Sequence, residues 1–218
     1  VRAPNSRVVF SPDADLDSGL TYPLIVKPNK EGSSKGVLDK NVVKNKKDLI
    51  YRVRLICATL AQEVLIEEFI DGREFTVALL GNQPPQVLPI IEQKFDFLPP
   101  GMNKISSYEL KWIYEDSLKN PKEAYDCPAK ISPQVREEIE NTSVKIFQVL
   151  NVRDCARIDY RLDRQGRLYF LEINTLPGFN PDEAVISYFP IAARASGLNY
   201  PDLIASILSA ACARYGIK

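Results

Sequence analysis

Histidine is absent from the 218-residue sequence, and the four cysteines (Cys57, Cys127, Cys155 and Cys212) show no CxxC spacing. A metal site built on nitrogen or sulfur ligands is therefore not expected. The sequence also lacks an apolar run near the roughly 18 residues of a membrane span, and the first residues form no hydrophobic signal core. We expect neither a membrane partner nor secretion, and scattered cysteines are typical of a reducing, cytoplasmic compartment.

The chain has no excess of charge, because 28 basic residues balance 28 acidic ones. No global field therefore favours nucleic acid or an anionic membrane surface, so small-molecule substrates are the expected partners. The hydrophobic content of 45% and the charged content of 26% are those of a globular protein with one large domain or two small lobes. The chain does not begin with methionine, which indicates a fragment or a processed chain.

A β-hairpin is predicted where the segments 155–162 and 167–174 flank the turn 163–166. Closing the hairpin on this turn places Asp159 opposite Phe170, and Arg157 opposite Glu172. One face is then apolar and the other polar. The apolar face carries Ala156, Ile158, Tyr160, Leu162, Tyr169, Leu171 and Ile173, and the polar face carries Arg157, Asp159, Glu172 and Asn174.

The polar face predicts a metal site. In the predicted register Asp159 and Glu172 are diagonal neighbours about 7 Å apart at the backbone, so both carboxylates can reach one hard cation. Magnesium suits such oxygen ligands better than zinc. The alternative is a solvated face with an ion pair between Arg157 and Glu172, and the hairpin alone leaves both interpretations open.

Hydrophobic periodicity predicts the other elements. Strands are expected at residues 21–28, 63–70, 73–80 and 86–94, and the tight turns make the last three antiparallel neighbours. Helices are expected at 46–61, after the capping pair Ser132-Pro133, at 186–197, and at 201–215 before Gly216. The intervening segment 95–131 is predicted to be irregular, a length that is usually functional or mobile.

Two further segments carry polar residues that suit a nucleotide. The loop from Lys27 to Gly36 has small residues that let backbone N–H groups approach a phosphate, although it lacks the Walker spacing; a plain turn is the alternative. Glu67 lies at the end of an apolar strand and Glu74 follows it. Their carboxylates can hold ribose hydroxyls, or they can simply face solvent at the edge of the strand.

In combination these features resemble the ATP-grasp superfamily, and within it the D-alanine–D-alanine ligases. The resemblance runs from about Tyr22 to the C-terminus and rests on the ordered segments 26–34, 64–77, 108–111, 157–159, 171–178 and 187–194. It implies an α+β ATP-grasp fold, with two α+β lobes whose antiparallel sheets hold ATP between them. We expect the lobes at residues 1–84 and 85–218. The N-terminal α/β domain of the family, which completes its substrate site, is expected to be absent from this chain.

The resemblance also implies a role for each matching residue. Lys27 and Lys111 would contact the phosphates of ATP under a closing loop, and Arg157 would stabilise the oxyanion of an acyl phosphate. The implied cofactor-binding residues are Lys27, Gly32, Ser34, Glu67, Phe69 and Ile70 (the last two by their backbone), Glu74 at the ribose, Lys111 and Leu171. Two Mg²⁺ ions, with Mn²⁺ as a substitute, would lie at Asp159, Glu172 and Asn174. The implied catalytic residues are Arg157, Lys111, Ser33 and Ser187.

The implied reaction joins a carboxylate to an amine through an acyl phosphate, giving a dipeptide such as D-alanyl-D-alanine, ADP and phosphate. The sequence departs from the family at two places: the stretch Phe179–Ile186, which concerns the substrate, is longer than the family norm, and Ala156 replaces a glycine at a packed strand. Asp182 and Glu183 in that stretch could read a different amine or lie in solvent. The alternatives are a truncated or regulatory Mg-ATP-binding module and a magnesium-dependent phosphoesterase. A homodimer is left open.

Overall fold

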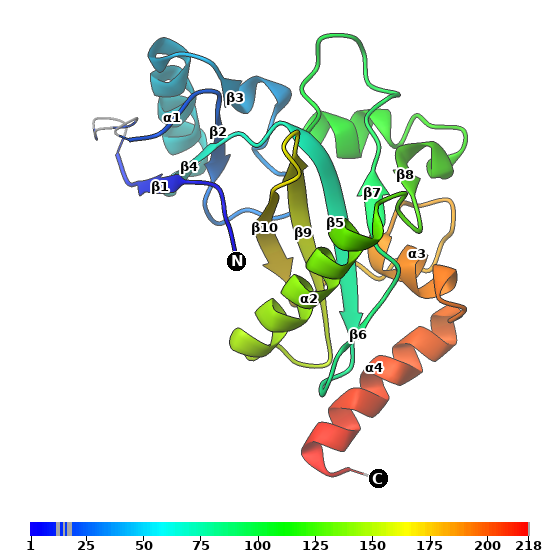
Figure 1. Ribbon diagram of the computed structural model, residues 1–218. Helices are drawn as coiled ribbons and strands as arrows, with labels where there is room; N and C mark the ends of the chain where they lie inside the picture. Colours follow the sequence, from blue (N-terminus) through cyan, green and yellow to red (C-terminus); the bar gives the residue numbers. More distant parts are fainter. Residues whose placement is uncertain (12–13, 15, 17–18, 218) are drawn as a thin grey trace. The chain divides into compact units, whose positions relative to one another are not determined.

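The computed structural model describes residues 1–11, 14, 16 and 19–217, which form two compact units. The large unit comprises Val1–Arg2, Gly72–Asp96 and Lys119–Lys218, and the small unit comprises Ala3–Asp71 and Phe97–Leu118 (Figure 1). This division differs from the predicted boundary after residue 84, because strand β5 (Gly72–Leu80) pairs along its whole length with β9 (Cys155–Asp163). The assignment of separate functions to lobes 1–84 and 85–218 stays a prediction.

The small unit is a four-stranded antiparallel sheet with one helix. The strand order is β1-β4-β2-β3, with β1 at Ser6–Val9, β2 at Leu24–Pro28, β3 at Val42–Val43 and β4 at Val64–Glu68. Helix α1 (Lys46–Leu60) begins where the Asn45 side chain accepts a hydrogen bond from the Asp48 amide at 3.0 Å. Its buried residues pack with β2 and β4 in a core that includes Leu24, Val26, Leu49, Val53 and Ile66.

The large unit is a six-stranded sheet with helices on both faces. Its order is β10-β9-β5-β7-β8, with β6 beside β5; the remaining strands are β6 (Gln86–Val87), β7 (Ile91–Gln93), β8 (Tyr125–Asp126) and β10 (Leu168–Asn174). The helices are α2 (Pro133–Val149), α3 (Tyr188–Ala195) and α4 (Tyr200–Tyr215). None of the helices in the described part of the chain is long and apolar enough to cross a membrane.

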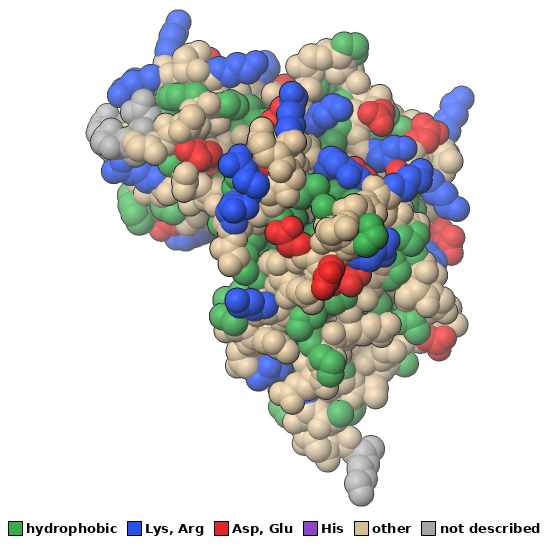
Figure 2. Space-filling model, in the orientation of Figure 1, with side chains coloured by type: hydrophobic (Ala, Val, Ile, Leu, Met, Phe, Trp, Pro, Cys, Tyr) green, Lys and Arg blue, Asp and Glu red, His purple; other side chains and the backbone are tan. Residues whose placement is uncertain are grey.

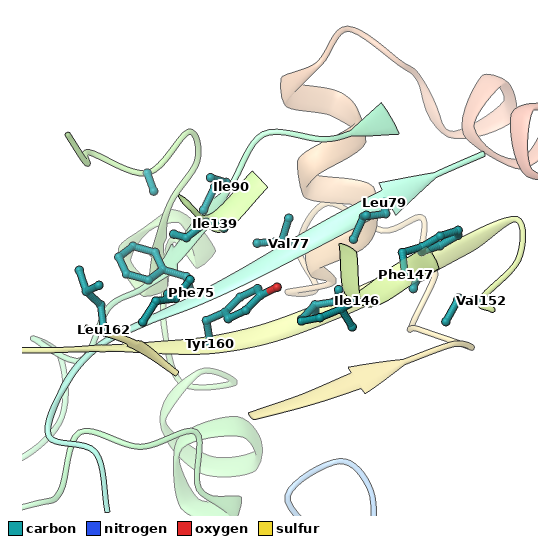
Figure 3. Close-up of a cluster of buried hydrophobic side chains, with 14 residues drawn as sticks. Phe75, Val77, Leu79, Ile90, Ile139, Ile146, Phe147, Val152, Tyr160 and Leu162 are labelled. Carbon is teal, nitrogen blue, oxygen red and sulfur yellow. The ribbon is translucent and has the colours of Figure 1, made fainter. Parts of the chain in front are cut away.

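Alternation along the strands sends apolar side chains to both faces of this sheet. The face against α2 is the larger core, in which the Tyr160 hydroxyl lies 2.9 Å from Ser143 Oγ. Figure 3 shows Tyr160 beside Phe75 and Val77, with Ile146 and Phe147 of α2. The opposite face packs against α3 through a second cluster: Ala78, Leu80, Leu88, Ile91, Cys155, Phe189, Ile191, Ala192, Ala193 and Leu203.

Basic and acidic side chains are interspersed on the surface drawn in Figure 2.

The hairpin of β9 and β10 forms, but in a different register from the prediction. Asp163 and Arg167 close a three-residue loop, with the Asp163 amide donating to the Arg167 carbonyl at 3.0 Å and Gly166 at φ 77°. A bulge at Leu171 then shifts the pairing once more, between Phe170 and Glu172. Leu168, Phe170 and Ile173 therefore share the apolar face, whereas the predicted register assigns Tyr169 and Leu171 to it.

Local elements were predicted better than strand pairings. The four predicted helices are present, with the Ser132 side chain capping α2 and Gly216 ending α4 at φ 68°. The prediction that β4 and β5 are neighbours was wrong, since β4 pairs with β1 and β2 in the small unit. The stretch 86–94 is broken into β6 and β7, and the segment 95–131 contains η2 (Leu110–Tyr114), η3 (Pro121–Ala124) and β8.

Gly72, at the start of β5, lies closer to β9 than any side chain would allow. A Cβ at this position would be 2.0 Å from the Leu162 carbonyl oxygen and 3.0 Å from the Asp163 Cα. Both are backbone atoms of the paired strand, so neither can move aside without opening the ladder. This position requires glycine for close approach rather than for a special dihedral angle.

Candidate functional site

The polar face of the large sheet aligns six residues across β5, β9 and β10. The pairing gives two adjacent rows, Thr76–Asp159–Glu172 and Ala78–Arg157–Asn174. Asp159 and Glu172 are thus direct cross-strand partners, rather than diagonal neighbours as predicted. Direct partners have Cβ atoms about 4.5–5.5 Å apart, so the two carboxylates converge more closely than the predicted register implied.

Asp159 is the centre of this arrangement. Arg157 donates from Nε to Asp159 Oδ1 at 3.1 Å and from its terminal nitrogen to Oδ2 at 2.8 Å. Thr76 Oγ1 donates to the same Oδ1 atom. The same Arg157 nitrogen lies 3.8 Å from Glu172 Oε1, and Asn174 Nδ2 donates to that oxygen at 2.9 Å. The four predicted residues are therefore together, and Thr76 joins them.

Burial differs across the site. The side chains of Arg157 and Asp159 are 18% and 16% exposed, whereas that of Glu172 is 61% exposed. Desolvation lowers the pKa of Arg157, but the Asp159 carboxylate outweighs it and the pKa is raised overall. Partial desolvation and the facing Asp159 carboxylate raise the pKa of Glu172. Two facing carboxylates thus repel each other, and a divalent cation would relieve the repulsion.

The donor set fits a hard cation. Carboxylate oxygens and an amide oxygen are the ligands that Mg²⁺ and Mn²⁺ accept, and Asn174 uses its nitrogen toward Glu172, which leaves its amide oxygen for a ligand. Within the described residues no group of three or more His, Cys, Asp or Glu side chains could hold a metal ion. A cation site on this face would therefore need Asn174 beside the two carboxylates.

The predicted phosphate loop lies in the small unit and has a strained backbone. Ser33 and Ser34 adopt positive φ angles of 54° and 59°, which non-glycine residues seldom do. Two contacts with residues far along the chain fix it: Ser34 Oγ donates to the Ser106 carbonyl at 2.6 Å, and Trp112 Nε1 donates to the Ser33 carbonyl at 3.2 Å. The segment 97–118 therefore packs against this loop, and Lys111 belongs to the same unit as Lys27.

Lys27 forms an ion pair with Glu67, which is only 7% exposed. The two residues lie on the neighbouring strands β2 and β4, where Ile25 pairs with Glu67 and Lys27 with Leu65. The Phe69 amide donates to the Pro23 carbonyl at 2.8 Å, so that N–H is already used within the protein. Lys27 and Glu67 are therefore in direct contact, and their binding of a nucleotide stays a prediction.

Two predicted residues of the large unit are fixed by the fold. Glu74 accepts a hydrogen bond at 3.1 Å from Arg161, which is 4% exposed, and this pairing gives Glu74 a structural role whatever it binds. Leu171 is half-buried at the bulge. A bulge commonly redirects a side chain beside a functional site.

The loop before α3 is held by Ser187, which is 8% exposed. Its hydroxyl donates to the Gly178 carbonyl at 3.1 Å and accepts from the Asn180 amide at 3.2 Å. Asp182 Oδ1 accepts from the Ala184 amide at 2.9 Å, so Asp182 shapes the turn. The Glu183 side chain is 77% exposed, with its carboxylate 3.8 Å from Arg194.

The predicted residues thus divide between the units. Lys27, Gly32, Ser33, Ser34, Glu67, Phe69, Ile70 and Lys111 belong to the small unit, and Glu74, Arg157, Asp159, Leu171, Glu172, Asn174 and Ser187 to the large unit. Thr76 and Trp112 were not predicted. Strand alternation from Glu74 places Thr76 on the polar face, which is a usable signal, but its partner Asp159 cannot be read from local sequence.

Solved structures with the same fold are ATP-grasp ligases. The structure matches a D-alanine–D-alanine ligase from Bacillus anthracis complexed with ATP, with a TM-score of 0.71, 23% identity, and coverage of 96% of this chain and 60% of that chain. It also matches the VanG D-Ala:D-Ser ligase from Enterococcus faecalis, with a TM-score of 0.71, 25% identity, and coverage of 96% and 57%. The predicted α+β ATP-grasp fold is confirmed.

The family follows from the sequence. The family model for the D-ala D-ala ligase C-terminus matches residues 10–209, so the chain belongs to the D-alanine–D-alanine ligase family. It is 37% identical over 204 residues to a D-alanine–D-alanine ligase of Acetivibrio thermocellus, covering 92% of this chain and 48% of the relative. It is 36% identical over 215 residues to the uncharacterized protein y4sG of Sinorhizobium fredii, covering 99% and 59%. The chain thus spans about half to three fifths of the length of these relatives.

Proposed function

We propose that the chain carries the ATP-binding and catalytic part of a ligase that joins the carboxylate of one amino acid to the amine of another. The product would be D-alanyl-D-alanine or a related dipeptide, formed through an acyl phosphate with release of ADP and phosphate. Membership of the family supports the ligase class. The residues of the polar face support this chemistry in this particular chain.

The observation that carries the proposal is the guanidinium of Arg157 fixed beside Asp159, Glu172 and Asn174. A module that only binds nucleotide needs oxygen ligands for a cation, but it has no need of a largely buried arginine among them. An arginine held at this place can stabilise negative charge that develops on the reacting carbonyl oxygen. The arginine and the oxygen ligands therefore support a ligase over a binding module.

The protein residues would act mainly by positioning and by charge. Lys27 and Lys111 would contact the phosphates of ATP, with Gly32, Ser33 and Ser34 covering them. Glu67 and the backbone of Phe69 and Ile70 would hold the adenine, with Phe69 using its carbonyl because its N–H donates to Pro23. Asp159, Glu172 and Asn174 would hold Mg²⁺, which supplies neutralisation of phosphoryl charge when it is bound.

Ser187 is our candidate for holding the carboxylate of the second amino acid. Its hydroxyl already joins the two sides of the loop from Gly178 to α3. Asp182 bonds within the stretch 179–186 to shape its turn, and Glu183 is the more accessible of the two acids. We propose that Glu183 is the residue of this stretch that meets an acceptor amine.

The second candidate function is a Mg-ATP-binding module without ligase activity by itself. The observation that favours it is the length of the chain, which covers only 48% of the Acetivibrio ligase. In this case a further domain would complete the substrate site, and a homodimer is a second arrangement to test. Both candidates predict binding of ATP, and only the first predicts stimulation by amino acids.

The test is ADP release from Mg-ATP with D-alanine, with a pool of L-amino acids, and with no addition. Stimulation by D-alanine supports the D-alanyl-D-alanine product, and stimulation only by the pool supports a related dipeptide. ATP binding without stimulation supports the second candidate. Phosphate release that is equal in all three conditions contradicts both and indicates a phosphoesterase.

A further inference from the structure

Thr76 forms a hydrogen bond with Asp159 and has no part in the reaction proposed above. Its side chain lies on the polar face of β5, only 8% exposed, directly across from Asp159. The hydroxyl donates to Asp159 Oδ1. Thr76 therefore contacts Asp159 from strand β5, whereas Glu172 faces Asp159 from β10, the strand on the other side of β9.

The contacts of Asp159 distinguish its two oxygens. Oδ1 accepts from Thr76 and from Arg157 Nε at 3.1 Å, which occupies the two lone pairs of that atom. Oδ2 accepts from the terminal nitrogen of Arg157, and the same nitrogen lies 3.8 Å from Glu172. Oδ2 is therefore the oxygen on the side of Glu172, where a cation would lie.

We infer that Thr76 is a positioning residue for the cation site: its hydroxyl holds Asp159 Oδ1 and thereby presents Oδ2 toward Glu172. This inference rests on the proposed function, because it assumes that Asp159 and Glu172 hold a divalent cation. Threonine suits the task, since branching at Cβ restricts its first side-chain torsion and fixes the direction of the hydroxyl. Partners that orient metal ligands commonly change metal affinity 10- to 100-fold when removed.

The test compares two pairs of variants that differ in the hydroxyl. Threonine and Thr76→Val have nearly the same shape, and Thr76→Ser and Thr76→Ala differ only in the oxygen. Mn²⁺ binding would be followed by the electron paramagnetic resonance of free Mn²⁺, with a non-hydrolysable ATP analogue at saturation. Thr142→Val, in helix α2 on the other side of the sheet, is the matched control.

We expect Thr76→Val to bind Mn²⁺ about 10- to 100-fold more weakly than the wild type. Thr76→Ser should bind better than Thr76→Ala, and Thr142→Val should bind like the wild type. Affinity for the analogue without metal should be unchanged, since Thr76 acts on the cation ligand. If Thr76→Val lowers the thermal midpoint strongly, the Ser and Ala pair decides the question.

Wild-type Mn²⁺ affinity in Thr76→Val, or equal binding by the Ser and Ala variants, would overturn the role of the hydroxyl. Asp159→Asn separates this failure from failure of the proposed function. If Asp159→Asn binds Mn²⁺ like the wild type, the metal site itself is wrong. If Asp159→Asn loses Mn²⁺ and Thr76→Val does not, only the inference about Thr76 fails.

Discussion

Substitution of Gly72 by alanine should destabilise the large unit by a predictable amount. The new Cβ would lie 2.0 Å from the Leu162 carbonyl oxygen, whereas ordinary contact begins at 3.4 Å. The start of β5 and the end of β9 would have to separate by roughly 1.4 Å, against a normal strand spacing of about 4.8 Å. The ladder between Gly72 and Asp163 would therefore open locally.

The cost can be estimated from two contributions. Overpacking against a rigid neighbour costs about 1–3 kcal/mol, and each weakened backbone hydrogen bond adds about 1 kcal/mol. We expect Gly72→Ala to lose about 2–4 kcal/mol of unfolding free energy. For a chain of this size that is a fall of roughly 5–15 °C in the midpoint.

The assay is differential scanning calorimetry, with Gly32→Ala as the control. Gly32 is exposed, a Cβ added to it would meet no atom within 4 Å, and its φ angle is not positive. Its substitution should change the unfolding free energy by less than about 0.5 kcal/mol. A Gly72→Ala midpoint equal to that of Gly32→Ala would refute the argument from close approach.

Three further predictions concern the site and the core. Asp159→Asn and Glu172→Gln should abolish ADP formation while keeping the far-ultraviolet circular dichroism spectrum, and normal turnover in either would remove the metal assignment. Because the pKa of Glu172 is raised, Mn²⁺ affinity should begin to fall at a higher pH than an ordinary glutamate would cause. A Mn²⁺ titration between about pH 4 and pH 7.5 that follows an ordinary glutamate would contradict this prediction for Glu172. The raised pKa also favours the protonated folded state, so its contribution to folding stability is full at low pH and is lost as pH rises through the raised pKa. Tyr160→Phe should cost about 1–3 kcal/mol in urea unfolding, because the buried Ser143 hydroxyl loses its partner, and adding Ser143→Ala should recover part of the loss; no recovery would argue against that pairing.

The helices were predictable because their signals are local. Apolar spacing, a side-chain cap such as Ser132 and a terminal glycine such as Gly216 all lie within or next to the helix they define. The pairing of strands is not local. Asp71 and Gly72 look like a hairpin turn, yet the chain passes there from one unit to the other, and β5 finds its partner β9 about eighty residues later.

The polar face was predicted from a register that was wrong. Closure by Asp163 and Arg167 displaced the register by one residue, and the bulge at Leu171 displaced it by one more. Two such shifts restore the alternation, so Glu172 and Asn174 return to the face of Asp159. The first shift has a local signal, since Asp163 accepts hydrogen bonds from the Gln165 and Arg167 amides within the turn and Gly166 has a positive φ angle. The bulge depends on packing across strands and has no such signal.

The bulge also means that the sheet does not need Leu171. If this residue were deleted, Phe170 and Glu172 would follow each other directly and would still point to opposite faces, in step with Tyr160 and Asp159. A chain one residue shorter could therefore keep its hairpin and keep Arg157, Asp159, Glu172 and Asn174 on one face. The register of the strand pair therefore gives no reason for Leu171, which agrees with the role at the nucleotide that we propose for this residue.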